Sequence, residues 1–228
     1  MKNLLVFTFL AFNTITIFGQ SNDTLLNISF ADIVLDGWRY DMGNISATRY
    51  CNGAPCNGEF IDTFPNGKVQ SKSFEIDGKA HGHYERYFEN GQLMMRGTLD
   101  LGKRIGFWEF YYENGQLEFE ATYSIKYFYP RTAIHYFENG NIALKSAYAD
   151  EDVMLYQHEF YEDGTKETSI ELIDIKELIY EEIRYHPNGQ IRERGKFREV
   201  DGSWKVFGTW SYYDTFGVFV YSENLGEF

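Results

Sequence analysis

Histidine is the side chain that most often acts as a general base, and the sequence holds five histidines. Two of them, His81 and His83, lie together in a glycine-bearing turn. The others lie five, six and three residues before a glycine that recurs along the chain: His135, His158 and His186. Because these fall at different positions of the recurring unit, we interpret each as a variable surface residue. The sequence also has no G-x-S-x-G elbow, P-loop glycine pattern or H-E-x-x-H motif. It therefore predicts no catalytic residue and no cofactor.

Carboxylates recur two residues before the same glycine, at Glu89, Glu113, Glu138 and Glu162. A Ca²⁺ ion needs several oxygen ligands at once. Successive hairpin turns on one edge of a sheet lie roughly 9–10 Å apart, too far for two neighbours to share an ion. We therefore expect solvated turn residues and no metal site. A glycan-acting enzyme that uses turn carboxylates stays an alternative, and it would need two of them about 5–10 Å apart in one cleft.

Cys51 and Cys56 are the two cysteines, and they flank the segment NGAP. Asparagine, glycine and proline are typical of a turn, which brings the two ends of such a segment together. In an oxidising compartment we therefore expect Cys51 and Cys56 to form a local disulfide, with free thiols as the alternative. Zinc is disfavoured because two thiols need two further ligands, and the spacing of His81 and His83 is not that of a usual zinc pair.

Aromatic side chains are the remaining candidates for a site. The segment FWEFYY at residues 107–112 places rings on both faces of an extended strand. One face must be core, and the other would present an exposed aromatic strip suited to peptides, glycans or another copy of the protein. The alternative is that both faces are covered. We take Tyr87, Phe107 and Tyr111 as the candidate binding surface.

The charge of the chain limits its partners. There are 34 Asp and Glu against 21 Lys and Arg, a formal charge of −13, and no run of basic residues. A nucleic-acid partner is therefore not expected, because phosphates require a concentrated basic face. Docking on an anionic membrane surface is disfavoured by the same sign, although it stays an alternative. We expect an acidic, solvated surface and a protein or envelope component as partner.

The first residues read as an export signal. Lys2 precedes the apolar run LLVFTFLAF, whose apolar character fades before Gln20. The run is too short to span a bilayer, so the pattern favours a cleavable signal peptide over residues 1–19. The alternative is a buried N-terminal strand. A signal peptide would place the mature chain in the periplasm or outside the cell.

One unit repeats along most of the chain. The glycine of an Asn-Gly or Asp-Gly turn recurs every 24 or 25 residues, at Gly67, Gly91, Gly115, Gly140, Gly164 and Gly189. Gly217 is a looser copy 28 residues further on. The fourth and third residues before each glycine are mostly aromatic, the second after it is mostly Val, Leu or Ile, and the sixth after it is mostly small. A fixed period of this length is typical of a repeat array.

Each copy is predicted to be a β-hairpin. Asn-Gly between alternating apolar runs is typical of a type I′ turn. After the turn, Leu117, Phe119, Ala121 and Tyr123 fall on one face with the period of two that marks a strand. We therefore predict an all-β protein, an elongated antiparallel meander of about six to seven hairpins whose neighbours cover one another. Residues 169–186 are predicted to be two strands around 174–177, with a helical insert as the alternative.

Two stretches resemble a known repeat. GKRIGFWEFYYENGQLEFEATY at residues 102–123 and GKAHGHYERYFENGQL at 78–93 closely resemble the variant MORN repeat, which occurs in bacterial proteins that include YwqK-type antitoxins. SWKVFGTWSYY at 203–213 recovers part of the same pattern. The resemblance extends from about residue 56 to residue 217. It implies an elongated β-meander that serves as a docking or scaffolding surface, sometimes at membranes, and is not an enzyme.

These observations combine into one interpretation. We expect a signal peptide at 1–19, an N-terminal segment at 20–56, a repeat array at 57–217 and a C-terminal tail at 218–228. The expected function is an exported, non-enzymatic binding or scaffolding surface at the bacterial cell envelope. The alternatives are an antitoxin-like partner of a toxin and the glycan-acting enzyme.

Overall fold

The computed structural model describes residues 48–126, 130–150, 153–200 and 203–226. The chain divides into two units, Met1–Gly43 and Asn44–Phe228, and all described residues lie in the second. The predicted signal peptide therefore lies outside the described residues, as does most of the predicted N-terminal segment. Among the described residues, no helix is both long and apolar enough to cross a bilayer.

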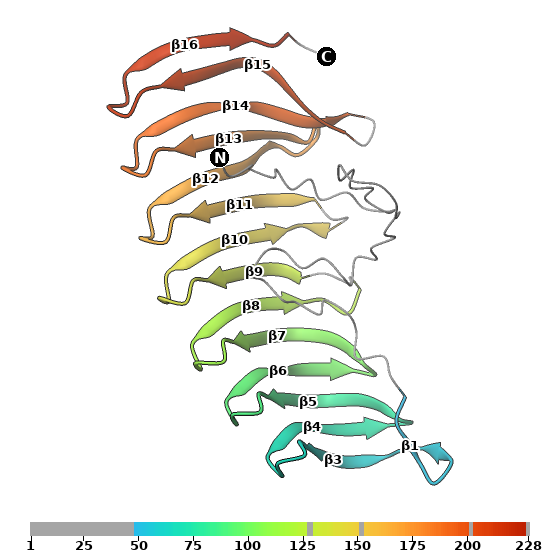
Figure 1. Ribbon diagram of the computed structural model, residues 1–228. Helices are drawn as coiled ribbons and strands as arrows, with labels where there is room; N and C mark the ends of the chain where they lie inside the picture. Colours follow the sequence, from blue (N-terminus) through green and yellow to red (C-terminus); the bar gives the residue numbers. More distant parts are fainter. Residues whose placement is uncertain (1–47, 127–129, 151–152, 201–202, 227–228) are drawn as a thin grey trace, which may run out of the picture. The chain divides into compact units, whose positions relative to one another are not determined.

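Fourteen strands form one antiparallel sheet in which each strand pairs with its neighbours in sequence, from β3 to β16 (Figure 1). β1 (Tyr50–Cys51) and β2 (Ala54–Pro55) pair separately as a small hairpin. The bounds of the sheet strands are β3 Gly58–Thr63, β4 Val69–Ile76, β5 Lys79–Tyr87, β6 Leu93–Asp100, β7 Lys103–Tyr111, β8 Leu117–Tyr123, β9 Pro130–Tyr136, β10 Ile142–Tyr148, β11 Met154–Phe160, β12 Lys166–Asp174, β13 Ile179–Tyr185, β14 Ile191–Val200, β15 Ser203–Tyr213 and β16 Phe219–Asn224. Fourteen strands make seven hairpins, so the predicted all-β meander is confirmed.

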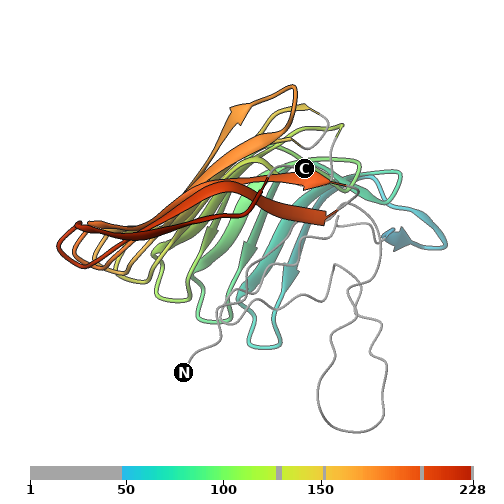
Figure 2. The same cartoon turned by 90° about the horizontal axis from the view of Figure 1, so that it is seen from above.

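Two details of the strand pattern bear on the predictions. Residues 169–186 hold β12 and β13 with a turn between them, which confirms two strands instead of a helix. β16 lies within residues 218–228, the segment expected to be a tail. In Figure 2, seen from above, successive hairpins rotate steadily relative to one another, which is the twist that strands of L-residues impose on a sheet.

The recurring turns lie together along one edge of the sheet (Figure 1). In the β5–β6 hairpin, Phe88 N–H donates to Gln92 O (2.8 Å) and Gly91 N–H donates to Phe88 O (2.9 Å). Gly91 has a φ of +96°, whereas Asn90 is not among the described residues with positive φ. This is a type I turn followed by a left-handed glycine, so the predicted type I′ turn is wrong at this position.

Type I′ turns are found instead in the loops on the opposite side of the sheet from the recurring turns. Between β4 and β5, both central residues have positive φ, 50° at Asp77 and 74° at Gly78. Between β6 and β7 the same holds for Leu101 (48°) and Gly102 (87°). Each of these loops has two residues between paired neighbours, and positive φ at both is what a type I′ turn requires.

The asparagine of the recurring turn connects neighbouring hairpins. Asn90 Oδ1 accepts a hydrogen bond from Gln92 N–H in its own turn (2.8 Å), and Asn90 Nδ2 donates to Glu113 O in the next turn (3.0 Å). The same bond between turns recurs twice, from Asn139 Nδ2 to Glu162 O and from Asn188 Nδ2 to Thr215 O. The period therefore reflects contacts between repeats as well as the conformation within each one.

Strand register sorts the side chains onto two faces, because directly paired residues share a face. The core face carries a row of aromatic rings across β5 to β9, with centroids 4.3–6.2 Å apart from each ring to the next: Tyr84, Trp108, Phe110, Phe119 and His135. The opposite face carries the aromatic residue that stands four before each recurring glycine, and we call it the tyrosine face: Tyr87, Tyr111, Tyr136, Phe160, Tyr185 and Tyr213.

The small residue six positions after the turn glycine makes room for tryptophan. The indole of Trp108 is fully buried on Gly97, where an added Cβ would lie 2.2 Å from the ring. Trp210 lies on Gly195 in the same way, again at 2.2 Å. Each indole N–H also donates to a backbone carbonyl, at 3.1 Å from Trp108 and 3.3 Å from Trp210. Any side chain at these glycines would displace the largest core residue of the repeat.

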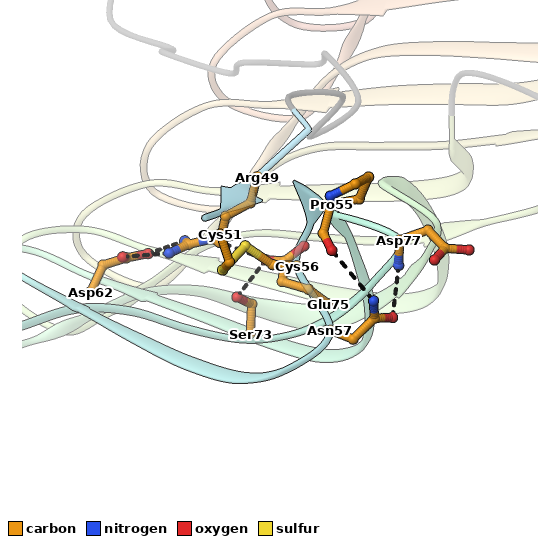
Figure 3. Close-up of a disulfide and its surroundings, with 9 residues drawn as sticks. All are labelled: Arg49, Cys51, Pro55, Cys56, Asn57, Asp62, Ser73, Glu75 and Asp77. Atoms are coloured by element: carbon orange, nitrogen blue, oxygen red, sulfur yellow. Dashed lines mark hydrogen bonds and ion pairs between the residues drawn. A yellow bond between two sulfur atoms is a disulfide. The ribbon is translucent and has the colours of Figure 1, made fainter. Parts of the chain in front are cut away.

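The β1–β2 hairpin lies over the core face of β3 and β4, the first strands of the sheet (Figure 3). In the structure Cys51 and Cys56 are disulfide-bonded, with their Cα atoms 5.1 Å apart. Arg49 reaches over β3 and donates to both carboxylate oxygens of Asp62, at 2.9 and 2.5 Å. Its guanidinium also lies 3.6 Å from the buried carboxylate of Glu75. The hairpin therefore covers the core face where that face is polar.

Candidate binding surface

Tyr87, Phe107 and Tyr111 all lie on the tyrosine face, on strands β5 and β7. Tyr87 and Tyr111 occupy equivalent positions two strands apart, which places them about 9–10 Å from each other. Phe107 lies four residues from Tyr111 along β7, or about 13 Å. Phe107 is 53% exposed, whereas the two tyrosines are half-buried. The three predicted residues therefore share a face without forming one cluster.

The phenol of Tyr87 is held by charged neighbours. Tyr87 Oη donates to Glu85 Oε2 (2.5 Å), and Lys72 Nζ donates to both Tyr87 Oη (2.9 Å) and Glu85 Oε2 (3.0 Å). The hydrogen bond from Tyr87 and the nearby ammonium of Lys72 lower the pKa of Glu85 to about 2. This network fixes the ring of Tyr87 against the sheet, with the ammonium of Lys72 over the ring at 5.2 Å from its centroid.

Equivalent charge pairs recur along the tyrosine face. Arg96 Nε donates to Glu109 Oε2 (2.5 Å) on the strand that carries Tyr111, and this bond lowers the pKa of the Glu109 carboxyl. Two strands further on, Tyr136 Oη donates to Glu120 Oε1 (2.9 Å). The tyrosine face of these hairpins is therefore a platform of half-buried rings and cross-strand ion pairs.

Sequence reasoning missed two exposed apolar residues on the same face. Ile61 on β3 is 64% exposed and Phe74 on β4 is 42% exposed. They lie diagonally across the β3–β4 pair, because Ile61 pairs with Lys72 and Phe74 pairs with Glu59. The hydrophobic pattern of β4 would assign Phe74 to the core face. The buried residues of β4 are instead polar: Ser71, Ser73 and Glu75. Strand register could have identified them, because residues that alternate with Lys72 along β4, and Ile61 opposite it on β3, share its face.

The turn carboxylates are exposed, and one of them, Glu138, also affects the pKa of Glu118. Glu138 lies near Glu118, and burial together with this neighbour raises the pKa of Glu118 to about 7. Across the part of the chain that the structure describes, no group of three or more His, Cys, Asp or Glu is placed to hold a metal ion.

His158 and His135 were interpreted as surface residues, and that prediction is wrong. His158 is only 9% exposed, and its Nε2 lies 2.5 Å from Glu171 Oε1 on the adjacent strand. His135 stacks on Phe119, and burial lowers the pKa of His135 to about 4. His135 occupies the position that Phe110 fills in the preceding repeat, so both histidines belong to the packing of the sheet.

The comparisons with known proteins address the repeat. Residues 80–100, 106–124 and 181–199 match the model of the MORN repeat variant. Three segments of the chain are thus similar to the variant MORN repeat. Each matched segment spans most of a hairpin centred on a recurring glycine: β5–β6, β7–β8 and β13–β14. Repeats of this family generally serve as binding modules.

The other comparisons add little to the similarity with the MORN repeat variant. The comparison with curated proteins gives no match. A solved structure, "Crystal structure of GtfA/B complex bound to UDP and GlcNAc", is similar at 13% identity over 75% of this chain, with a TM-score of 0.22. The chain spans 32% of the length of that structure's matched chain. At this level of likeness the structure carries no argument about activity.

Proposed function

We propose that this chain is an exported, non-enzymatic MORN-repeat protein that binds a protein partner at the bacterial cell envelope through the tyrosine face of β3–β8. The observation that carries the proposal is the exposure of Ile61, Phe74 and Phe107 on that one face, beside fixed tyrosines. Interfaces are enriched in aromatic residues at their centre and in polar groups at the rim. Rings that are already held by neighbours lose little conformational entropy when a partner binds.

The charge of the chain favours a partner with a basic contact patch. The formal charge is −13, so a basic protein would be steered toward it at low ionic strength. An antitoxin-like role, in which the chain binds a basic toxin exported to the same compartment, is a narrower form of the same proposal. The identity of the captured protein separates the two.

Export is the second part of the proposal, and it rests on the N-terminal sequence. If a signal peptide is removed near Gln20, intact-mass measurement of protein from the periplasm or medium gives a chain that starts near this residue. A full-length chain retained in the cytoplasm contradicts this part and leaves the binding surface to be tested separately.

The test of the surface is affinity capture from an envelope extract. The bait is the tagged mature chain, compared with a Phe74→Ser/Phe107→Ser variant. A matched control is Phe216→Ser, which also replaces an exposed phenylalanine but in the turn before β16. Because all three positions are exposed, each variant should keep the thermal unfolding midpoint of the parent within a few degrees.

The proposal predicts that the same partner is recovered with the parent and with Phe216→Ser, at roughly tenfold lower yield with the double variant. Equal recovery with all three baits contradicts the tyrosine face as the binding surface. Loss with Phe216→Ser alone would place binding at the other end of the sheet.

A further inference from the structure

β16 is the last strand of the sheet and pairs with β15 alone among the described strands. All six of its residues are exposed, including the consecutive apolar side chains Phe219, Val220 and Tyr221. The strand contains no Lys, Arg or Pro, the residues that most often prevent pairing at a sheet edge. An edge of this kind is a template for a further strand.

The backbone of β16 requires an extended strand as its partner. Leu225 N–H donates to Gly208 O across the β15–β16 pair (2.9 Å). Because hydrogen bonds alternate along an antiparallel strand, the N–H groups of Ser222 and Asn224 point away from β15. Only another extended backbone satisfies such a row in register.

We propose that β16 pairs with β16 of a second copy of this chain, antiparallel and related by a two-fold axis at Tyr221. Tyr221 stacks on Tyr212 of β15, with ring centroids 4.4 Å apart and planes 14° apart. The residue at the equivalent position in an inner repeat is Phe119, which has rings on both sides, Phe110 at 5.2 Å and His135 at 4.3 Å. Tyr221 of the second copy supplies the missing ring on the open side and continues the row.

Charge favours the two-fold pairing over a head-to-tail one. The alternative partner for β16 is β3 of the next copy, which brings the exposed acid Glu59 to an edge that already carries Glu223. With the two-fold axis at Tyr221, the nearest core-face side chain of the second copy to Glu223 is Tyr221 and not another acid. Head-to-tail pairing would also generate open filaments, whereas a two-fold contact closes at a dimer.

The first measurement is the mass of the full chain in solution from about 1 to about 200 µM, by light scattering after size exclusion. The expected result is a reversible rise from the mass of one chain to that of two. Higher salt should strengthen the dimer, because it screens the repulsion between two chains of charge −13. Monomer at every concentration, or continued growth beyond two chains, would overturn the proposal.

Two variants test the register and the edge. Residues that face each other in a non-hydrogen-bonded antiparallel pair have Cα atoms about 4.5 Å apart, close enough for a disulfide. Tyr221→Cys should therefore give a covalent dimer under mild oxidation, whereas Ile61→Cys on β3, the other edge strand, should not. Ser222→Pro removes an N–H that points away from β15 and should raise the dimer dissociation constant at least tenfold.

Unchanged dimerisation in Ser222→Pro, with its circular dichroism spectrum retained, overturns the proposal. Equal cross-linking of the two cysteine variants does so as well. Dimer that survives Ser222→Pro and is lost on substitution of Phe107 would assign self-association to the tyrosine face. None of these outcomes depends on the function proposed for that face.

Discussion

The two terminal strands of this sheet, β3 and β16, differ in how far other described residues cover them. At β3, the β1–β2 hairpin lies over the core face, its disulfide joins Cys51 to Cys56, and Arg49 forms ion pairs with Asp62 and Glu75. At β16 every residue is exposed, and several are apolar. An array built from one repeat has no intrinsic reason to end, so each end must be covered or left to a partner. Within the described residues, the core face is covered at β3 and the whole of β16 is exposed.

The largest expected loss of stability follows substitution of the buried tryptophans, Trp108 inside the array and Trp210 near its end. Trp108→Ala should lower the free energy of unfolding by about 3–5 kcal/mol, because the ring is fully buried between aromatic neighbours. Trp210→Ala, one strand from the open edge, should lose less, about 2–3 kcal/mol, because a terminal repeat can open on its own. Urea unfolding followed by circular dichroism measures both. Equal losses would remove the distinction between the interior and the open end.

Removal of the disulfide tests the covered end. Cys51→Ser/Cys56→Ser should destabilise the chain by about 2 kcal/mol, since the bond closes a short loop. In exported protein, mass spectrometry without reduction should find the two cysteines linked, two hydrogens lighter than free thiols. Free thiols in that sample would contradict the predicted disulfide.

Arg49→Met is the next smaller change at the same end. It leaves Asp62 without its guanidinium partner and removes the guanidinium that lies 3.6 Å from the buried carboxylate of Glu75. The expected loss is about 1–2 kcal/mol at neutral pH. Arg49 holds the pKa of Asp62 below its ordinary value of 3.8, so this contribution is lost as pH falls through the lowered value. The variant and the parent should therefore converge in acid, and a constant difference would contradict the ion pair.

The smallest effect concerns the carboxylate pair in the middle of the array. Burial and Glu138 raise the pKa of Glu118 to about 7 from 4.5. Folding therefore stabilises the protonated acid, and this contribution is lost as pH rises from about 4.5 through about 7. Because Glu118 is half-buried, we expect about 1 kcal/mol. Glu118→Gln should become more stable than the parent above pH 7, while Glu113→Gln, in a solvated turn, should not.

The sequence predicted the sheet well because the repeat combines local and neighbouring interactions. The period of the turn glycines predicted about six to seven hairpins, and it also separated β12 from β13 where a helical insert was the alternative. Turn chemistry was less predictable. The Asn-Gly pairs do not form type I′ turns. The Asn90 side chain instead accepts a hydrogen bond within its own turn and donates one to the next hairpin.

The candidate surface was predicted only in part. Tyr87, Phe107 and Tyr111 were assigned to an exposed aromatic strip, and they do share a face. Ile61 and Phe74 were missed, because the buried residues of β4 are polar and the contact that explains them, Arg49, comes from outside the repeat. β16 was missed because its residues show no alternation between apolar and polar. Contacts between distant segments and exposure at a sheet end are properties of the assembled array.

The most direct test of the difference between the two ends is hydrogen–deuterium exchange of the full chain at about 1 µM and about 100 µM. The account predicts that amides of β3 exchange at the same rate at both concentrations. The amides of Ser222 and Asn224 should exchange fast at the lower concentration and slow at least several-fold at the higher one. Concentration-independent exchange of β16, or equal slowing of β3 and β16, would contradict the account.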